Sequence, residues 1–158
     1  MPHSPRFAIA LLGMGMLMTA CGEQVNSAPA TSSSAPTAAA ATDSYDINAL
    51  LAAADPAKGQ IVFLQCRACH SLEADGPNKV GPNLHGVIGH KAGLAPGFAY
   101  SDQMTASGVV WSAETLDKFL LRPSDFIPGT RMVFVGLRKP EDRANVIAYI
   151  RQETGAAK

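Results

Sequence analysis

Five consecutive residues, Cys66-Arg67-Ala68-Cys69-His70, constrain the fold of this chain more than any other stretch. Cys66 and Cys69 lie about one helical turn apart, so both sulfur atoms can face one porphyrin and form thioethers with its two vinyl groups. His70 is then held beneath the iron and can bind it through a ring nitrogen. The motif therefore predicts one covalently attached c-type haem.

Two other sites use a Cys-x-x-Cys pair, and the sequence favours neither. A closed zinc site takes about four ligands, usually with a second Cys or His pair, and no such pair follows Cys69. A thioredoxin-like redox motif lies in a βαβ unit, and we find no pattern of that kind around residues 66–70.

The first twenty residues have the pattern of an export signal. Arg6 precedes the apolar run 7–20, which at 14 residues is short against the roughly 20 that a helix needs to cross a bilayer. The run ends in Met18-Thr19-Ala20-Cys21-Gly22, which resembles a bacterial lipoprotein box. We therefore predict a lipoprotein-type signal peptide over residues 1–20 and lipidation of Cys21. Ordinary cleavage nearby and an uncleaved anchor remain as alternatives.

Residues 21–44 are expected to be the lipidated Cys21 followed by a flexible linker. The linker is rich in Ala, Ser, Thr and Pro and almost without large apolar residues, so it cannot bury enough surface to offset the entropy of ordering. As a flexible coil it would span about 25–30 Å. It would serve either as a tether that keeps the folded part near the membrane or as a spacer without a mechanistic role.

Residues 45–158 are predicted to form one all-α domain with long loops, because no stretch alternates convincingly as a strand. Asp55 and Ser112 are typical N-caps, and Pro56 and Pro140 suit first helical positions. The helix that begins at Pro56 is expected to continue through the cysteines, with Gly59 allowing another helix to cross closely. Helices are predicted at about 46–54, from 56 through the cysteines, at 102–106, at 113–121 and at 140–154.

The apolar stripes of these helices are short for a domain of this length. The two main stripes comprise Leu116, Phe119 and Leu120, and Val146, Ile147 and Ile150. A haem would supply the missing apolar mass, and we expect the haem-free chain to be poorly folded.

Several further stretches carry a resemblance to a known family. They are residues 59–63 (GQIVF), 81–86 (GPNLHG), 89–93 (GHKAG), 95–100 (APGFAY), Trp111, 128–132 (PGTRM) and 147–149 (IAY). With the haem motif, they make the domain similar to mitochondrial-type class I cytochrome c and its small bacterial relatives. The resemblance implies the cytochrome c fold, with three main helices and long loops wrapped around one covalent haem. It covers neither the signal nor the linker.

The resemblance also implies a role for individual residues. Cys66 and Cys69 would carry the haem thioethers, and His70 and Met132 would be the axial iron ligands. The Pro82 carbonyl would fix the orientation of His70. The remaining implied positions are Tyr100 and Trp111 as donors to a haem propionate, Gly59 and Phe63 against Val146 and Tyr149, and Phe134 by the haem edge.

Three positions depart from the family pattern. His90 stands where an Arg usually helps to neutralise the propionates, Met104 where an Asn usually joins a polar network, and Phe119 where a Tyr usually points at the Met sulfur. Met104 and Phe119 remove polar groups beside the haem, so an altered water network is expected there. His85 and His90 are the rivals of Met132 as the second ligand, although each is better explained as a surface or propionate-side residue.

Axial His and Met ligands suit an electron carrier rather than an enzyme, because both iron positions are filled. The expected donor is a quinol-oxidising cytochrome bc complex, and the expected acceptor is a terminal oxidase or a photosynthetic reaction centre. The expected location is the bacterial periplasmic side, anchored through lipidated Cys21, with a soluble periplasmic protein as second choice. A subunit permanently bound to a dehydrogenase or oxidase complex, or a ligand-binding or peroxidatic haem, remains as an alternative.

The charge balance limits the partners further. The formal net charge is zero, and residues 45–158 hold 12 Lys and Arg against 11 Asp and Glu. Nothing indicates a nucleic-acid partner, and no small-molecule substrate is expected. Long-range electrostatic steering should be modest. A ring of cations around the haem edge, or a generic solvated face, is expected from Arg67, Lys79, Lys91, Arg131, Arg138 and Lys139.

Overall fold

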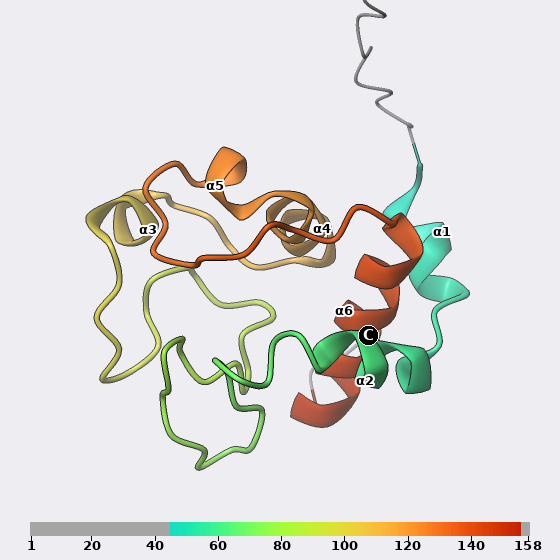
Figure 1. Ribbon diagram of the computed structural model, residues 1–158, viewed down its shortest axis with the longest axis horizontal. Coiled ribbons are helices and arrows are strands. Elements are labelled where there is room, and N and C mark those ends of the chain that lie inside the picture. The colour runs from blue at the N-terminus through green and yellow to red at the C-terminus, as the bar shows by residue number, and fades with distance from the viewer. Residues whose placement is uncertain (1–44, 156–158) are drawn as a thin grey trace, which may run out of the picture. The chain divides into compact units, whose positions relative to one another are not determined.

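The structure, a computed structural model, describes residues 45–155. Six helices are present in them: α1 (Ile47–Ala52), α2 (Pro56–Phe63), α3 (Asp102–Ala106), α4 (Ala113–Leu121), α5 (Pro123–Phe126) and α6 (Pro140–Thr154) (Figure 1). Between Tyr45 and Gly155 the only β-type pairing is an isolated antiparallel bridge of Lys91 with Val110. The predicted all-α class is confirmed, with α2, α4 and α6 as the main helices. The predicted signal, Cys21 and linker lie outside the described residues.

The helices α2, α4 and α6 begin where the sequence predicted, and at α2 and α4 side-chain hydrogen bonds satisfy the first amides. The Asp55 side chain accepts from the Ala57 amide at 2.9 Å, and Pro56 opens α2. The Ser112 hydroxyl accepts from the Thr115 amide at 3.2 Å, and Thr115 bonds back to the Ser112 amide, completing a capping box on α4. At the other end of the domain, α6 stops at Gly155, which adopts the left-handed conformation.

The prediction that α2 contains the cysteines is wrong. The helix ends at Phe63, and tighter turns follow, in which the Cys66 amide bonds to the Phe63 carbonyl at 2.8 Å. The amides of Leu64, Gln65 and Cys66 each bond three residues back, in place of the regular helical ladder. The His70 amide still bonds to the Cys66 carbonyl at 3.0 Å, so one turn holds the whole motif.

The short helix α5 was not predicted. Pro123 ends α4, as expected, because its ring removes a donor amide. The same ring presets the helical φ angle, so Pro123 also occupies the first position of the next helix.

The close crossing of α2 and α6 depends on Gly59. A Cβ atom at this position would lie 2.0 Å from the Asn145 carbonyl oxygen and 2.7 Å from the Tyr149 Cβ. One turn further on, the rings of Phe63 and Tyr149 pack with their centroids 5.5 Å apart. The predicted close packing at Gly59 is confirmed, and it joins the first and last of the main helices.

The core lies between α4 and α6 and extends toward the loops. Val146 and Ile147 on α6 are completely buried. They belong to one cluster with the predicted stripe of α4, which is Leu116, Phe119 and Leu120. Ile47 buries α1 in the same half of the molecule, against α4 and α6.

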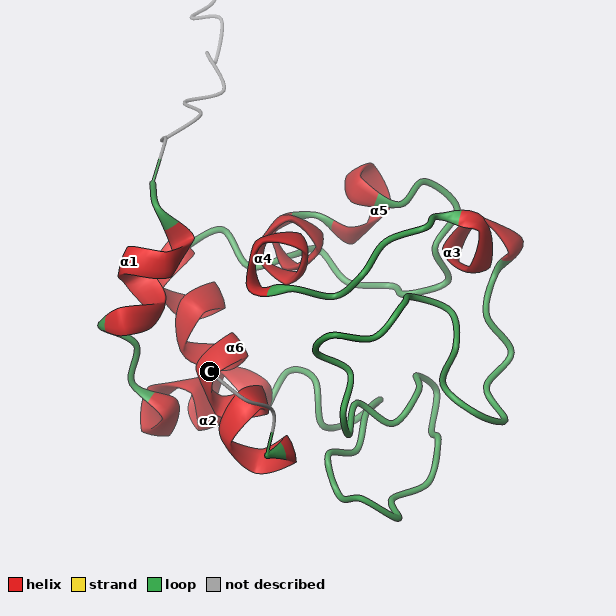
Figure 2. Cartoon of the chain, turned by 180° about the vertical axis from the view of Figure 1, so that it is seen from behind, coloured by secondary structure: helices red, strands yellow, loops and turns green. Residues whose placement is uncertain are grey.

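Long loops form the other half of the domain, and they are plain in Figure 2 between α2 and α3. Side chains hold them by bonds to the backbone. The Asn83 amide donates to the carbonyls of Glu73 and Gly76, both at 2.8 Å, and the Asn78 amide donates to the Pro96 carbonyl at 2.9 Å. From Tyr45 to Gly155, no helix has the length and apolar character that crossing a bilayer requires.

Candidate functional site

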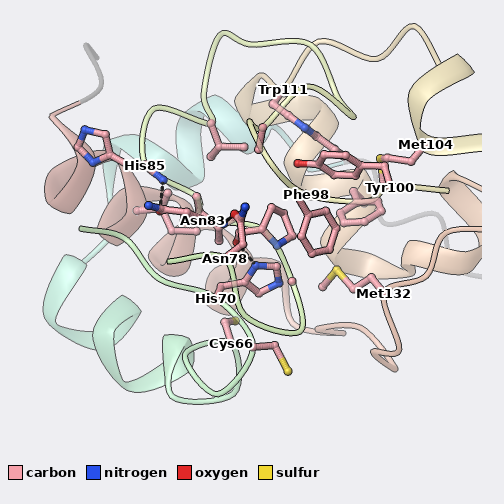
Figure 3. Close-up of a pocket in the computed structure, with 18 of the residues that line it drawn as sticks. Cys66, His70, Asn78, Asn83, His85, Phe98, Tyr100, Met104, Trp111 and Met132 are labelled. Carbon is pink, nitrogen blue, oxygen red and sulfur yellow. Dashed lines mark hydrogen bonds between the residues drawn. The ribbon is translucent and has the colours of Figure 1, made fainter. Parts of the chain in front are cut away.

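The loops enclose a cavity of about 980 Å³, at the upper end of the usual size for ligand pockets. Its walls come from segments far apart in the sequence (Figure 3). The cavity brings together all of the haem-site residues predicted within the described part of the chain, namely Cys66, Cys69, His70, Pro82, Tyr100, Trp111 and Met132.

His70 is oriented by a single backbone carbonyl. Its Nδ1 lies 2.7 Å from the Pro82 carbonyl oxygen, and because a carbonyl can only accept, Nδ1 carries the ring proton. The lone pair of Nε2 is then left for another partner. Burial lowers the pKa of His70, which favours the neutral ring that metal ligation requires. The bond between His70 and Pro82 that the family resemblance implied is thus present.

Gly81 leaves space for the His70 ring because it has no side chain. The sequence did not predict this role. A Cβ atom on Gly81 would lie 2.3 Å from His70 Cε1 and 2.7 Å from Nδ1. The Gly81 amide also donates to the Cys69 carbonyl at 2.9 Å, which ties this loop to the haem motif. The only signal in the sequence was the glycine directly before Pro82.

Cys66 and Cys69 are half-buried, and neither forms a disulfide. Burial, with a smaller contribution from Cys69, raises the pKa of the Cys66 thiol to about 11, so it is protonated at neutral pH. Within residues 45–155, no three His, Cys, Asp or Glu side chains gather in a group that could hold a metal ion. The two thiols therefore do not belong to a closed zinc site built from the described residues.

Met132 lines the cavity from the segment between α5 and α6, together with Phe134. Tyr100 and Trp111 line it from another part of the chain. Burial raises the pKa of Tyr100, so its hydroxyl keeps its proton at neutral pH and can donate. The rings of Tyr100 and Phe98 pack edge to face with their centroids 4.8 Å apart, and this contact restricts the orientation of the Tyr100 ring.

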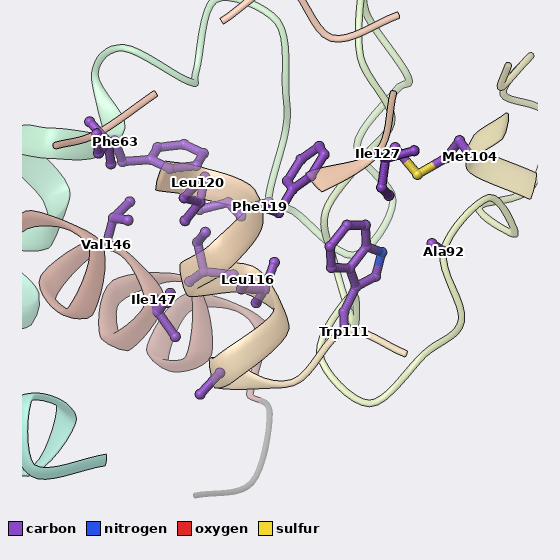
Figure 4. Close-up of a cluster of buried hydrophobic side chains, with 14 residues drawn as sticks. Phe63, Ala92, Met104, Trp111, Leu116, Phe119, Leu120, Ile127, Val146 and Ile147 are labelled. Carbon is purple, nitrogen blue, oxygen red and sulfur yellow. The ribbon is translucent and has the colours of Figure 1, made fainter. Parts of the chain in front are cut away.

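The three residues that depart from the family pattern, His90, Met104 and Phe119, also line the cavity. Met104 and Phe119 are buried, and Phe119 packs on Trp111 with ring centroids 4.9 Å apart (Figure 4). This wall is therefore apolar. His85, considered as a rival ligand, places its Nδ1 3.0 Å from the Leu72 carbonyl oxygen, in contact with the loop backbone.

Two cations of the expected docking ring are engaged with the backbone. Lys79 Nζ donates to the carbonyls of Arg67 and His70, at 2.9 and 3.1 Å. Arg131 Nη1 donates to the Ala99 carbonyl at 3.0 Å. Both side chains remain exposed, so they brace the loops and still add positive charge beside the cavity.

The site has the parts that a covalent haem requires. Two thiols can form the thioethers, a buried neutral imidazole has a free lone pair, and a large apolar cavity adjoins both. A thioether sulfur, that of Met132, lines the same cavity. These residues fit haem c.

Comparisons with known proteins agree with this geometry. The family model described as "Cytochrome c" matches residues 56–154. The chain is 51% identical to cytochrome c2 of Rhodomicrobium vannielii over 104 residues, covering 66% of this chain and 83% of that protein. It is 47% identical to cytochrome c of Chlamydomonas reinhardtii over 103 residues, covering 65% and 92%. The solved structure of cytochrome cH from Methylobacterium extorquens superposes with a TM-score of 0.59 at 42% identity, covering 62% of this chain and 98% of that one. The chain therefore belongs to the class I cytochrome c family, whose members carry one covalent haem c and transfer electrons.

Proposed function

We propose that this protein is a membrane-tethered carrier of single electrons, with His70 and Met132 as the axial ligands of its haem iron. One observation carries the proposal. The Pro82 carbonyl fixes the proton of His70 on Nδ1 and leaves Nε2 for iron, while the Met132 thioether lines the same cavity. When bound, haem c supplies a redox centre that accepts and releases one electron.

The protein's own residues attach, orient and shield this group. Cys66 and Cys69 would hold it covalently, and the Pro82 carbonyl keeps the His70 ring in one orientation. Tyr100 and Trp111, which line the cavity, would donate hydrogen bonds to a haem propionate. Met104 and Phe119 give the cavity an apolar wall, which disfavours water beside the iron.

With His70 and Met132 both bound to the iron, no position would be open for oxygen or another substrate, so the proposed role is electron transfer without catalysis. The thioether of Met132 favours ferrous iron and raises the reduction potential relative to bis-His ligation. We propose a quinol-oxidising cytochrome bc complex as donor, and a terminal oxidase or photosynthetic reaction centre as acceptor.

The proposed location is the periplasmic side of a bacterial membrane, with lipidated Cys21 as the anchor and residues 22–44 as the tether. The support is the lipoprotein-like sequence at 18–22 and the composition of the following residues. Mass spectrometry of the native N-terminus tests this, because an unmodified Cys21 would leave a soluble periplasmic carrier as the alternative.

Replacing Met132 with Ala tests the ligand assignment. We expect the ferric thioether-to-iron charge-transfer band to disappear and the ferrous form to bind carbon monoxide at neutral pH, because one axial position is then vacant. Met104→Leu is the matched control, since it removes the other cavity thioether and should leave the band in place. Unchanged ferric spectra in the Met132 variant would show that another group binds the iron.

The place in the electron-transfer chain is tested in native membranes. We expect the haem to stay oxidised when the bc complex is inhibited and to stay reduced when the acceptor is inhibited. Redox cycling that neither inhibitor affects would contradict the proposed partners.

A further inference from the structure

The residues that precede the family match are bound into the domain. The match begins at residue 56, whereas Tyr45 and α1 lie before it. The Tyr45 hydroxyl donates to Asp117 Oδ2 on α4 and accepts from Arg143 Nη2 on α6. Its ring also lies over the guanidinium, with Arg143 Cζ 5.3 Å from the ring centroid. Tyr45 therefore covers the buried Arg143 guanidinium with its ring and accepts a hydrogen bond from it with its hydroxyl.

Arg143 links this contact to the backbone that follows Met132. Its side chain is only 1% exposed. Its Nε donates to Asp117 Oδ1 at 2.7 Å, and its Nη1 donates to the carbonyls of Leu137 and Arg138, at 2.7 and 2.9 Å. One guanidinium thus joins α4, α6, Tyr45 and the end of the segment that carries Met132.

The segment at 131–138 has no helix of its own and depends on such anchors. Val133 and Val135 project into solvent. The segment is fastened at its far end, where the Leu137 amide donates to the Leu120 carbonyl at 2.8 Å. Gly136 lies beside this bond with φ of +92°, and a Cβ atom there would lie 2.0 Å from the Leu121 carbonyl oxygen. The bonds from Arg143 complete this far-end anchor.

We propose that Tyr45, Asp117 and Arg143 form a clamp that positions residues 131–138 and so holds Met132 at the cavity. Tyr45 is the positioning residue of this clamp that lies outside the family-matched region. Without its ring and hydroxyl, water reaches the guanidinium and competes for the hydrogens that Leu137 and Arg138 now accept. The segment then opens more often. The spectroscopic part of this proposal rests on Met132 being the iron ligand.

The test uses the haem-loaded, full-length protein and the variants Tyr45→Phe and Tyr45→Leu. Ferric protein is titrated with imidazole, which binds iron only when Met132 has left, so its apparent dissociation constant falls as the open fraction rises. We expect imidazole to bind at least about five-fold more tightly to Tyr45→Phe, because this variant loses both hydrogen bonds of the hydroxyl and a single one is worth about that factor. Tyr45→Leu should show a larger effect, because it also uncovers the guanidinium.

Tyr149→Phe is the matched control. It also removes a phenol hydroxyl, but Tyr149 packs on Phe63 at the crossing of α2 and α6. Imidazole affinity should match that of the wild type. Equal tightening in this variant would overturn the clamp, because any loss of a hydroxyl would then open the segment.

Amide hydrogen exchange gives a readout that does not involve the iron. In Tyr45→Phe we expect faster exchange at Leu137, which is bonded to Leu120, and unchanged exchange at Ile147 within α6. Equal acceleration of exchange at both amides would mean that Tyr45 only stabilises the domain as a whole. Unchanged exchange at both amides would mean that Tyr45 does not position residues 131–138. Either result overturns the proposal.

The two readouts separate this proposal from the ligand assignment. If wild-type protein already binds imidazole as tightly as Met132→Ala, Met132 is not the iron ligand. The ligand assignment within the proposed function is then wrong. The exchange rates of Leu137 and Ile147 then decide alone whether the clamp exists.

Discussion

His70 shows how much of the site depends on backbone next to one side chain. The Pro82 carbonyl sets the tautomer, and the absence of a side chain on Gly81 leaves room for the ring. An imidazole held in this way would need no rearrangement to bind the haem iron. The backbone at 81 and 82 therefore sets the orientation of the imidazole.

Gly81→Ala should destabilise the haem-loaded protein by about 1–3 kcal/mol, as overpacking of a filled site does. The added methyl group would overlap the His70 ring, which would have to tilt away from the Pro82 carbonyl. Urea unfolding measures the loss, and the ferric spectrum reports the change in the ligand. Gly76→Ala is the control, because its methyl group would come no closer than 3.0 Å to Glu73 and Ser71, whereas that of Gly81→Ala would come within 2.3 Å of His70. Equal losses in both variants would contradict the role of Gly81.

Local motifs made most of the site predictable at the residue scale. The haem motif is five consecutive residues, and Pro82 and Met132 lie in short, specific stretches. The clamp carries no such signal. Tyr45 is 72 residues from Asp117 and 98 from Arg143. In the sequence, none of the three differs from any other polar residue near a helix. Only the packing of α1 on α4 and α6 brings them together.

At the scale of helices, the starts were predictable and one end was not. Caps such as Asp55 and Ser112 act within three residues, so the sequence shows them directly. No Gly or Pro marks the end of α2 at Phe63. The chain leaves the helix there while keeping helix-like turns through the cysteines, a change that only its hydrogen bonds reveal.

The crossing of α2 and α6 should fail when Gly59 is replaced by Ala. We expect a loss of about 2–3 kcal/mol or more, because the new methyl group would overlap the Asn145 carbonyl, which is backbone and cannot rotate away. Chemical unfolding of haem-loaded protein measures this. Gln60→Ala, at the next and exposed position of the same helix, should change stability by less than about 0.5 kcal/mol. A tolerated Gly59→Ala would mean that the helices can separate without cost.

At the scale of the whole domain, the haem is expected to be a large part of the core. Left empty, a closed cavity of about 980 Å³ would cost about 20 kcal/mol by the scaling of core deletions, above the about 5–15 kcal/mol that stabilises a typical domain. Water entering from the open side lowers this cost, but it cannot replace apolar contacts.

The Cys66→Ala, Cys69→Ala double variant, made without haem attachment, should therefore be poorly folded. We expect weak helical circular dichroism and no cooperative thermal transition, with haem-loaded wild type as the control. Native helical content with a sharp thermal transition in the double variant would show that the loops fold without haem.

The near balance of charges belongs to the same scale. With 12 Lys and Arg against 11 Asp and Glu from residue 45 onward, long-range attraction to a partner should be small. We expect turnover with a terminal oxidase to change little, by less than about three-fold, between 20 and 200 mM salt. A steep fall with ionic strength would show that a local group of cations dominates docking. The Arg131→Gln variant removes one positive charge at the cavity and would then show how much of the salt dependence is due to Arg131.

The contact between α2 and α6 also governs the order of events during biosynthesis. Residues 56–63 find their partner only when residues 140–154 have been made, so the domain cannot close while the chain is still emerging. Until then, we expect Cys66 and Cys69 to stay accessible as reduced thiols for haem attachment. Because most of the domain's sequence separates α2 from α6, we expect haem attachment to precede folding.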